Sequence, residues 1–311
     1  MSTTTQIPAY EDKTRTRFFV KFWGTRGSIP TPGFRTRKYG GNTSCVELRI
    51  DDTLIICDGG TGLRELGAAI VKRSQGQPVE AHLFFSHPHW DHIQGFPFFQ
   101  PAYDDKNTFH IYGTHRGDQR IFRLLSGQMR SDYFPVSFSE LGARILPRDL
   151  DEIDSRIDGV TVRAFEQHHP GTSFGFSFEK EGLRVVYATD NELDLTLDDP
   201  DLIARDPSAT RRPPEAYLEF LRGADLVIAD GQYTDHEYPE KQGWGHARAT
   251  TVVDAAILAG VRQLAIYHHD PLHSDDDVDA LIEMCRARVK DSGSSLVVFG
   301  AREGLELRVG A

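Results

Sequence analysis

Residues 87–92 place three histidines and one aspartate within six positions, one residue after the apolar run 83–85. Imidazole nitrogens and carboxylate oxygens are ligands that suit zinc and its neighbours in the first transition series. Ligands this close in sequence cannot all converge on one tetrahedral ion, because the backbone holds their side chains apart. We therefore expect two of them to bind one ion and two to bind another, in a binuclear site suited to hydrolysis.

Further clusters of ligand residues each follow a predicted strand downstream. They are His168 and His169 after 160–165, Asp190 after 183–188, and His268 and His269 after 264–267. A sheet fixes the backbone where a strand ends, and the loop that follows lets a side chain turn inward. Because alternate residues near a strand end face opposite ways, we expect only one histidine of each pair to point inward. These positions complete the two metal sites.

The elements that position these loops are predicted from hydrophobic periodicity. Period-two alternation and short apolar runs indicate strands at 18–24, 45–50, 53–58, 82–85, 109–113, 160–165, 173–179, 183–188, 226–229, 264–267 and 296–299. Helical spacing indicates helices at 117–130, 247–260 and 274–291, and one that begins near residue 62 with Leu63, Leu66, Ile70 and Val71 on its inner face. Two sheets packed together with helices outside satisfy this order.

The domain organisation expected from the sequence is simple. Residues 1–17 are a polar N-terminal extension, and 18–311 form a single domain without an internal linker. An Asp- and Pro-rich insertion at about 192–214 is compatible with a lid or with a surface loop. The polar N-terminus resembles no secretory signal, and no run of about 18 apolar residues predicts a membrane span. With three cysteines in no metal-binding spacing, we expect reduced thiols and a cytoplasmic protein.

The formal net charge of −11 bears on the binding partners. A strongly negative protein repels polyanions unless it has a local basic face, so a long nucleic acid is expected to be an unlikely partner. A small-molecule substrate, bound mainly through metals, is expected instead. A homodimer is compatible with the sequence.

Residues 87–92, His-Pro-His-Trp-Asp-His, resemble the His-x-His-x-Asp-His signature of the metallo-β-lactamase superfamily, and the order of the later ligands matches as well. Residues 23–30 and 40–45 resemble the ribonuclease Z-like branch, and within it bacterial phosphodiesterases and related small hydrolases. The resemblance implies an α+β fold, a four-layer αββα sandwich of two mixed sheets flanked by helices. It places the metals at one edge of the two sheets.

The resemblance also assigns ligands by motif position. It implies one ion held by His87, His89 and His169, a second held by Asp91, His92 and His268, and Asp190 bridging the two. His169 is preferred to His168 because a Pro-Gly pair follows it, and His268 is preferred to His269 because it directly follows the strand. Zinc is the first choice of ion, and manganese or iron(II) is compatible. Asp58 is expected to support the metal loops.

His246 and Asp230 narrow the class of enzyme. Ribonuclease Z-like enzymes have a histidine before a helix that protonates the leaving oxygen, and an acidic residue that orients it, whereas lactamases and glyoxalases lack this pair. His246 and Asp230 match these positions and, with Asp91, form the expected catalytic set. The alternative for His246 is a surface role at a helix start. The chain lacks an evident counterpart of the basic arm that grips tRNA in ribonuclease Z, which disfavours tRNA 3′ processing.

The sequence therefore favours a phosphodiesterase that acts on a small phosphodiester, with a cyclic nucleotide among the candidates. A metal-bridged hydroxide would attack, and His246 would act as general acid. A lactone or thioester hydrolase on the same fold and a non-catalytic, metal-stabilised regulatory protein are the alternatives. Aromatic residues that could stack a nucleobase, although most are expected to be core or loop anchors, are Trp90, Phe96, Phe98, Phe99, Tyr133, Phe134 and Trp244.

Overall fold

The computed structural model describes residues 16–113, 120–148, 156–199, 202–206 and 208–310. Most of the expected N-terminal extension, 1–17, lies outside these residues. So do the start of the helix expected at 117–130 and three positions of the expected insertion at 192–214. The division into one domain with an insertion stays a prediction.

The first sheet is built mainly from the N-terminal half of the chain. Its strand order is β14-β1-β2-β3-β4-β5-β6. The strands are β1 Phe18–Gly24, β2 Cys45–Ile50, β3 Thr53–Cys57, β4 Glu80–Phe84, β5 Thr108–Tyr112, β6 Arg144–Arg148 and β14 Glu306–Arg308. β2 and β3 form an antiparallel hairpin, and β3 to β6 run parallel. The α-helices of this half are α1 Gly62–Ser74, α2 Trp90–Ile93 and α3 Arg120–Gly127.

The second sheet is built from the C-terminal half, in the order β13-β12-β11-β10-β9-β8-β7. The strands are β7 Arg156–Ile157, β8 Val160–Gln167, β9 Ser173–Lys180, β10 Leu183–Ala188, β11 Leu226–Asp230, β12 Gln263–Tyr267 and β13 Val297–Gly300. β10 to β13 run parallel. The helices are α4 Leu202–Arg205, α5 Glu215–Leu221, α6 Tyr238–Lys241, α7 Ala249–Leu258 and α8 Asp275–Asp291.

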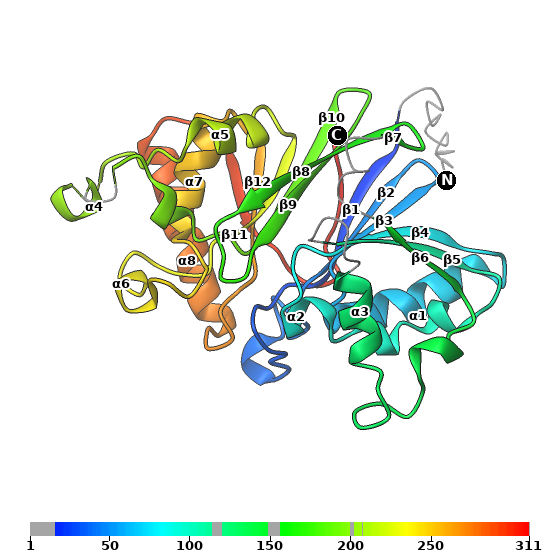
Figure 1. Cartoon of the computed structure of the whole chain (residues 1–311). Helices are drawn as coiled ribbons and strands as arrows, with labels where there is room; N and C mark the ends of the chain where they lie inside the picture. Colours follow the sequence, from blue (N-terminus) through cyan, green and yellow to red (C-terminus); the bar gives the residue numbers. More distant parts are fainter. Residues whose placement is uncertain (1–15, 114–119, 149–155, 200–201, 207, 311) are drawn as a thin grey trace, which may run out of the picture.

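Figure 1 shows the two sheets with helices on their outer sides, and three apolar clusters hold these layers together. One lies between the sheets and joins side chains of β1 to β4 with those of β8 to β12. A second packs α5, α7 and α8 on the outer face of the second sheet, and a third packs α1 and α3 on the outer face of the first. The expected α+β sandwich of two sheets flanked by helices is confirmed. Val71 departs from the expected inner face of α1, since it is 40% exposed.

The two halves are also joined at the edge where the ligand loops lie. The guanidinium of Arg26 is fully buried and donates to the carbonyl oxygens of Gly40, Asp270 and His273 at 2.8–3.0 Å. Beside it, the amide of His269 donates to the carbonyl of Thr25 at 2.9 Å. The loop after β1 is therefore fixed against the loop after β12. Among the described residues, none of the helices has the length and apolar character that a membrane span requires.

Candidate metal centre

The predicted ligands gather at one edge of the two sheets. His87 and His89 follow β4, Asp91 and His92 belong to α2, and His169, Asp190 and His268 follow β8, β10 and β12. Because β8, β10 and β12 run in the same direction, their carboxyl ends lie at the same edge. Asp190 and His268 have left-handed φ angles of 56° and 58°. For residues other than glycine this conformation costs about 1–3 kcal/mol and is concentrated at functional sites.

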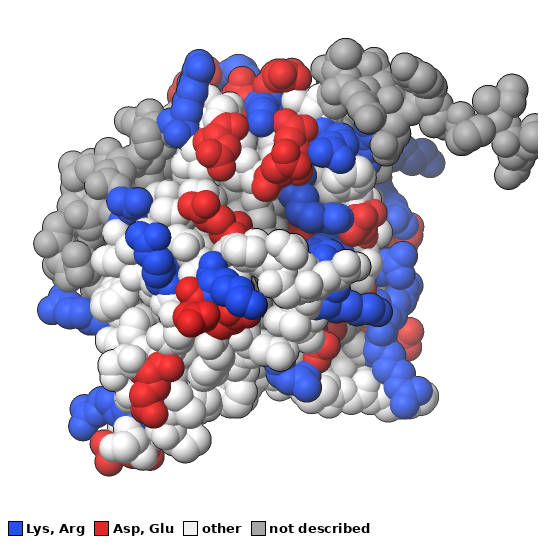
Figure 2. Space-filling view, turned by 90° about the vertical axis from the view of Figure 1, so that its right-hand side faces the viewer, with Lys and Arg blue, Asp and Glu red and all other residues white. Residues whose placement is uncertain are grey.

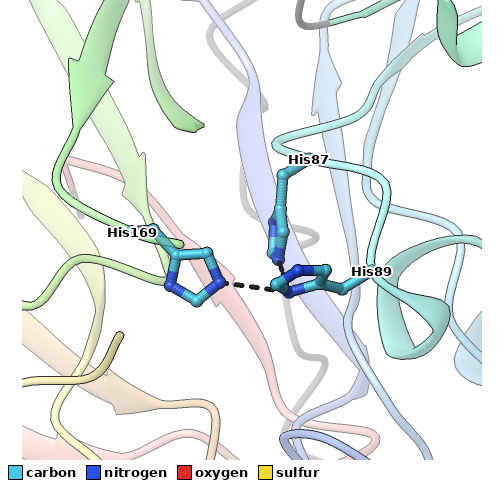
Figure 3. Close-up of side chains that lie close together, drawn as sticks. All are labelled: His87, His89 and His169. Carbon is cyan, nitrogen blue, oxygen red and sulfur yellow. Dashed lines mark hydrogen bonds between the residues drawn. The ribbon is translucent and has the colours of Figure 1, made fainter. Parts of the chain in front are cut away.

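The first set of ligands consists of His87, His89 and His169 (Figure 3). Nε2 of His87 lies 2.9 Å from Nδ1 of His89, and Nε2 of His169 lies 3.1 Å from that same Nδ1. The three rings come from two loops and turn their nitrogen atoms toward a common point. His87 is buried, whereas His89 is exposed at the mouth of the site.

The second set consists of Asp91, His92 and His268. Nε2 of His268 lies 3.0 Å from Oδ2 of Asp91 and 3.3 Å from Nε2 of His92. Nε2 of His92 lies 3.2 Å from the same Asp91 oxygen. All three side chains are buried, and their ligand atoms lie within 4.8 Å of one another. The structure therefore brings together both predicted sets.

Asp190 lies between the two sets and turns one carboxylate oxygen toward each. Its Oδ2 lies 3.5 Å from Nε2 of His87 and 3.8 Å from Nε2 of His169. Its Oδ1 lies 3.4 Å from Nε2 of both His92 and His268. This is the geometry expected of a bridging carboxylate.

The imidazoles are oriented so that nitrogen lone pairs face the cluster. Nδ1 of His92 lies 2.7 Å from Oδ2 of Asp58, and Nδ1 of His169 lies 2.8 Å from the carbonyl oxygen of Gly245. Both partner oxygens accept a hydrogen bond, so each Nδ1 carries the proton and donates. In the neutral ring each Nε2 is then left unprotonated. Burial lowers the pKa of His169 to about 4 and that of His87 well below its usual value. These two rings are therefore neutral at pH 7.

The carboxylates complete a donor set that fits divalent cations. Burial raises the pKa values of Asp91 and Asp190, but the surrounding imidazoles outweigh this effect and bring both well below the usual range. In the described part of the chain, only histidines lie within ion-pair distance of these two carboxylates. Carboxylate oxygens and imidazole nitrogens that face shared points suit zinc, manganese or iron(II).

In each pair of adjacent histidines, one side chain points toward the cluster and the other points away, as predicted from the sequence. His168 is exposed, and its backbone amide donates to the side chain of Asn191. His269 is buried away from the cluster, and its Nε2 donates to the carbonyl of Ala301 at 2.8 Å. Only His169 and His268 turn toward the other ligands.

Asp58 supports the ligand loops through hydrogen bonds. Its side chain is 1% exposed and accepts from the amide of Ser86 at 2.7 Å, from the Ser86 hydroxyl at 2.8 Å and from His92. The hydroxyl of Tyr187, on β10 in the second sheet, donates to Oδ2 of Asp58 at 2.6 Å. Ser86 and Tyr187 were not singled out by the sequence, because nothing in their type or spacing indicates contact with Asp58.

His246 and Asp230 form a buried pair next to the cluster. Nδ1 of His246 donates to Oδ2 of Asp230 at 2.7 Å, and the same nitrogen lies 4.0 Å from Oδ2 of Asp190. Burial lowers the pKa of His246, but the charge and hydrogen bond of Asp230 outweigh it and raise the pKa to about 9. His246 is 7% exposed and does not lie on the surface. The imidazolium form is therefore stabilised beside the candidate metal centre.

Glu192 holds the loop that carries His246, a role that was not predicted from the sequence. Its carboxylate is 1% exposed and accepts from the amides of Gly243 at 2.6 Å and Gly245 at 2.7 Å. The hydroxyl of Tyr238 also donates to it, at 2.8 Å. The first residues of the expected 192–214 insertion are thus buried beneath the site and do not form a surface loop. The Gly-Trp-Gly run, whose amides need partners, was the one available signal.

A cavity of about 430 Å³ lies above these groups. Its floor consists of His89, Asp91, His169, Asp190, His246 and His268, and its rim includes Trp90, Lys241, Trp244 and Leu272. Of the aromatic residues expected to stack a base or to anchor the core, Phe96 and Phe99 are buried in the core. Trp90 and Trp244 are instead 67% and 60% exposed. The cavity therefore has the candidate metal ligands on its floor and two exposed indoles at its rim.

Comparisons with known proteins agree with this geometry. Residues 53–269 match the family model of the beta-lactamase superfamily domain. A ribonuclease Z of Methanosarcina mazei is 27% identical, over 83% of this chain and 89% of that protein. A metallo-beta-lactamase fold protein, YhfI of Bacillus subtilis, has a TM-score of 0.67 at 18% identity, covering 94% of this chain and 100% of that chain. A diphosphatase of the PhnP family has a TM-score of 0.61 at 16% identity, covering 94% and 97%.

The expectation that a long nucleic acid is an unlikely partner is wrong, because the curated relatives are named ribonuclease Z. That expectation rested on the net charge of −11, which is an average over the whole chain. On the face that Figure 2 shows, basic and acidic side chains are interspersed, so the average does not describe the local surface. The family match spans more than half of the chain, and this protein therefore belongs to the beta-lactamase superfamily, in its branch of metal-dependent hydrolases with the metallo-β-lactamase fold.

Proposed function

We propose that this protein is a binuclear metal-dependent phosphodiesterase that acts on a small phosphodiester, with a cyclic nucleotide among the candidates. The observation that carries the proposal is the buried His246–Asp230 pair, at 2.7 Å, beside the carboxylate of Asp190. Nδ1 of His246 is bound to Asp230, so Nε2 carries the proton that can be transferred. The ring lines the cavity, where a substrate phosphate would lie.

The residues around the cavity suit the cleavage of a bond to a poor leaving group. When bound, two divalent ions supply an activated water and neutralise the charge of the phosphate. The chain itself must then supply a proton to the departing alkoxide, and a positioned acid of this kind contributes about 10²–10⁴-fold. With its pKa raised to about 9, His246 is protonated at pH 7. The hydrogen bond from Nδ1 to Asp230 fixes the orientation of the His246 ring.

A lactone or thioester hydrolase remains the first alternative. Hydrolysis of a carbonyl substrate depends on a donor that polarises the carbonyl oxygen more than on an acid for the leaving group. A buried imidazolium next to the bridging carboxylate therefore favours phosphodiester cleavage. A non-catalytic role would not require both ligand sets to converge on Asp190.

RNA is the second candidate substrate, and the relatives named ribonuclease Z favour it. The chemistry is the same, because RNA cleavage also breaks a phosphodiester and releases an alkoxide. These hypotheses can be compared in one assay of the metal-loaded protein with four substrates: bis-p-nitrophenyl phosphate, a cyclic nucleotide, a precursor tRNA and a simple lactone. Hydrolysis of the lactone alone would reject the phosphodiesterase proposal, and specific cleavage of the tRNA would establish RNA as the substrate.

We expect His246→Ala to slow the cleavage of poor leaving groups most. The variant should lose about 10²–10⁴-fold in kcat on a diester with an alkyl leaving group, and much less on p-nitrophenyl diesters, whose leaving group needs no proton. Its metal content should stay at the wild-type value. His168→Ala, a change at an exposed histidine outside the cluster, is the matched control. An equal loss on both kinds of leaving group would reject the acid role.

Removal of a ligand should change the metal content in a way that distinguishes the two sets. The wild-type protein should hold two divalent ions per chain, measured by elemental analysis after dialysis. We expect His268→Ala to retain about one ion, because only the second set loses a ligand, and to lower kcat at least about 100-fold. His269→Ala, at the neighbouring histidine that faces Ala301, should keep both ions. A wild-type content of one ion would contradict the binuclear assignment.

Glu192→Gln tests how the loop holds His246. In the wild-type protein the backbone amides of Gly243 and Gly245 each donate to one oxygen of the Glu192 carboxylate. A glutamine side chain has a single oxygen, and its NH₂ group cannot accept, so these two backbone amides would compete for one acceptor. We expect the free energy of unfolding to fall by about 1–3 kcal/mol. We also expect a loss of kcat that is larger for alkyl than for p-nitrophenyl leaving groups, as for His246→Ala. A loss of stability with unchanged leaving-group dependence would show that Glu192 has only a structural role.

A further inference from the structure

Two of the three tryptophans of this chain lie at the mouth of the candidate metal centre. Trp90 is 67% exposed and Trp244 is 60% exposed, although an indole is among the most apolar side chains. They come from different halves of the chain, since Trp90 begins α2 and Trp244 follows α6, and Figure 1 shows these two helices apart. Both line the cavity above the ligands.

The backbone at Trp244 is fixed on both sides. The amides of Gly243 and Gly245 both donate to the buried carboxylate of Glu192. The ammonium of Lys241 lies 4.2 Å from the centroid of the Trp244 ring and so covers one face of the indole. Such cation–π contacts orient a ring, and the other face is left for a ligand.

The backbone at Trp90 is fixed by hydrogen bonds, since the amide of His92 donates to the carbonyl of His89 at 3.0 Å and the amide of Gln94 donates to the carbonyl of Trp90 at 2.8 Å. Within the described part of the chain, neither Trp90 nor Trp244 packs against another aromatic ring or donates its indole N–H. Trp23 provides the contrast, since it is half-buried and its Nε1 donates to Glu47 at 2.8 Å. The two rim indoles thus have free surfaces on a rigid backbone.

We propose that Trp90 and Trp244 form a base-stacking rim, so that the substrate is a phosphodiester that bears a nucleobase next to the scissile phosphate. This inference rests on the proposed phosphodiesterase function. Exposed aromatic rings stack on any base, because every base has a π-face. Lys241 is the single Lys or Arg among the described residues that line the cavity, and it can bind an anionic group of the nucleotide. A small alkyl group would leave most of the exposed indole surface in water.

The preference for a substrate that bears a nucleobase can be tested with two diesters that share one leaving group. Thymidine 5′-(p-nitrophenyl phosphate) carries a base on the retained side, and methyl p-nitrophenyl phosphate carries none. We expect the wild-type protein to prefer the thymidine diester by about 5- to 150-fold in kcat/KM, as stacking by one or two rings gives. In the double variant Trp90→Leu, Trp244→Leu this preference should disappear, and each single variant should lose part of it.

Tyr133→Leu is the matched control, because Tyr133 is 73% exposed and lies outside the cavity lining. It should keep the wild-type preference. Trp244→Phe should retain more of the preference than Trp244→Leu, since a smaller ring still stacks. The base-stacking rim would be overturned if the wild-type protein showed no preference between the two diesters. It would also be overturned if the double variant lost kcat/KM on both diesters by the same factor. Either result would leave the phosphodiesterase proposal standing.

A binding measurement separates this inference from the proposed catalysis. Thymidine 5′-monophosphate should quench the tryptophan fluorescence of the metal-loaded protein and bind at least about 5-fold more tightly than ribose 5-phosphate. Both effects should vanish in the double variant, in which Trp23 remains as an internal reference. Equal binding of the two phosphates would reject the rim whether or not the protein hydrolyses a diester. If the protein bound the thymidine nucleotide selectively but hydrolysed neither diester, only the proposed activity would be rejected.

Discussion

The arrangement of the candidate metal centre depends on the buried carboxylate of Asp58, because it joins the two sheets where the loops of the predicted ligands leave them. It accepts from Ser86 on the loop after β4, from His92 in α2 and from Tyr187 on β10. The bond to His92 fixes the tautomer that turns Nε2 toward the ligand cluster. The bond to Tyr187 holds β10, which ends two residues before Asp190, against the first sheet. Loss of this one side chain would leave several buried donors unpaired and would let the two ligand sets move apart.

The sequence predicts which residues gather at this edge, because histidine and aspartate directly after buried strands are chemically conspicuous, and their role as ligands stays a prediction. It also predicts the central strands, since their apolar runs are long enough to read. It misses β6, β7 and β14, which are edge strands with charged ends and few apolar residues. It misses Glu192 for another reason: this carboxylate accepts from backbone amides, and the Gly-Trp-Gly run does not show which carboxylate its amides will meet.

The net charge of the chain was a poor guide to its partners. Electrostatic attraction depends on the charges near the binding surface, within about a Debye length, and not on the total. Here the cavity floor holds two carboxylates, those of Asp91 and Asp190, and both belong to the candidate donor set for cations. Bound divalent ions would reverse the sign of the field that a phosphate meets. The same residues that contribute to the charge of −11 are therefore compatible with an anionic substrate.

The loop around Gly245 couples metal binding to the proposed acid. Its amide donates to Glu192, its carbonyl accepts from His169, and the next residue is His246. Gly245 has φ of 91°, and a Cβ there would lie 2.3 Å from Nδ1 of His169, so only glycine fits. A shift of this loop would disturb a ligand and the acid together, and substitutions at the two should not be additive. Trp244 lies between the fixed amides with its ring in solvent, so specificity can change at this position while the chemistry beneath it is preserved.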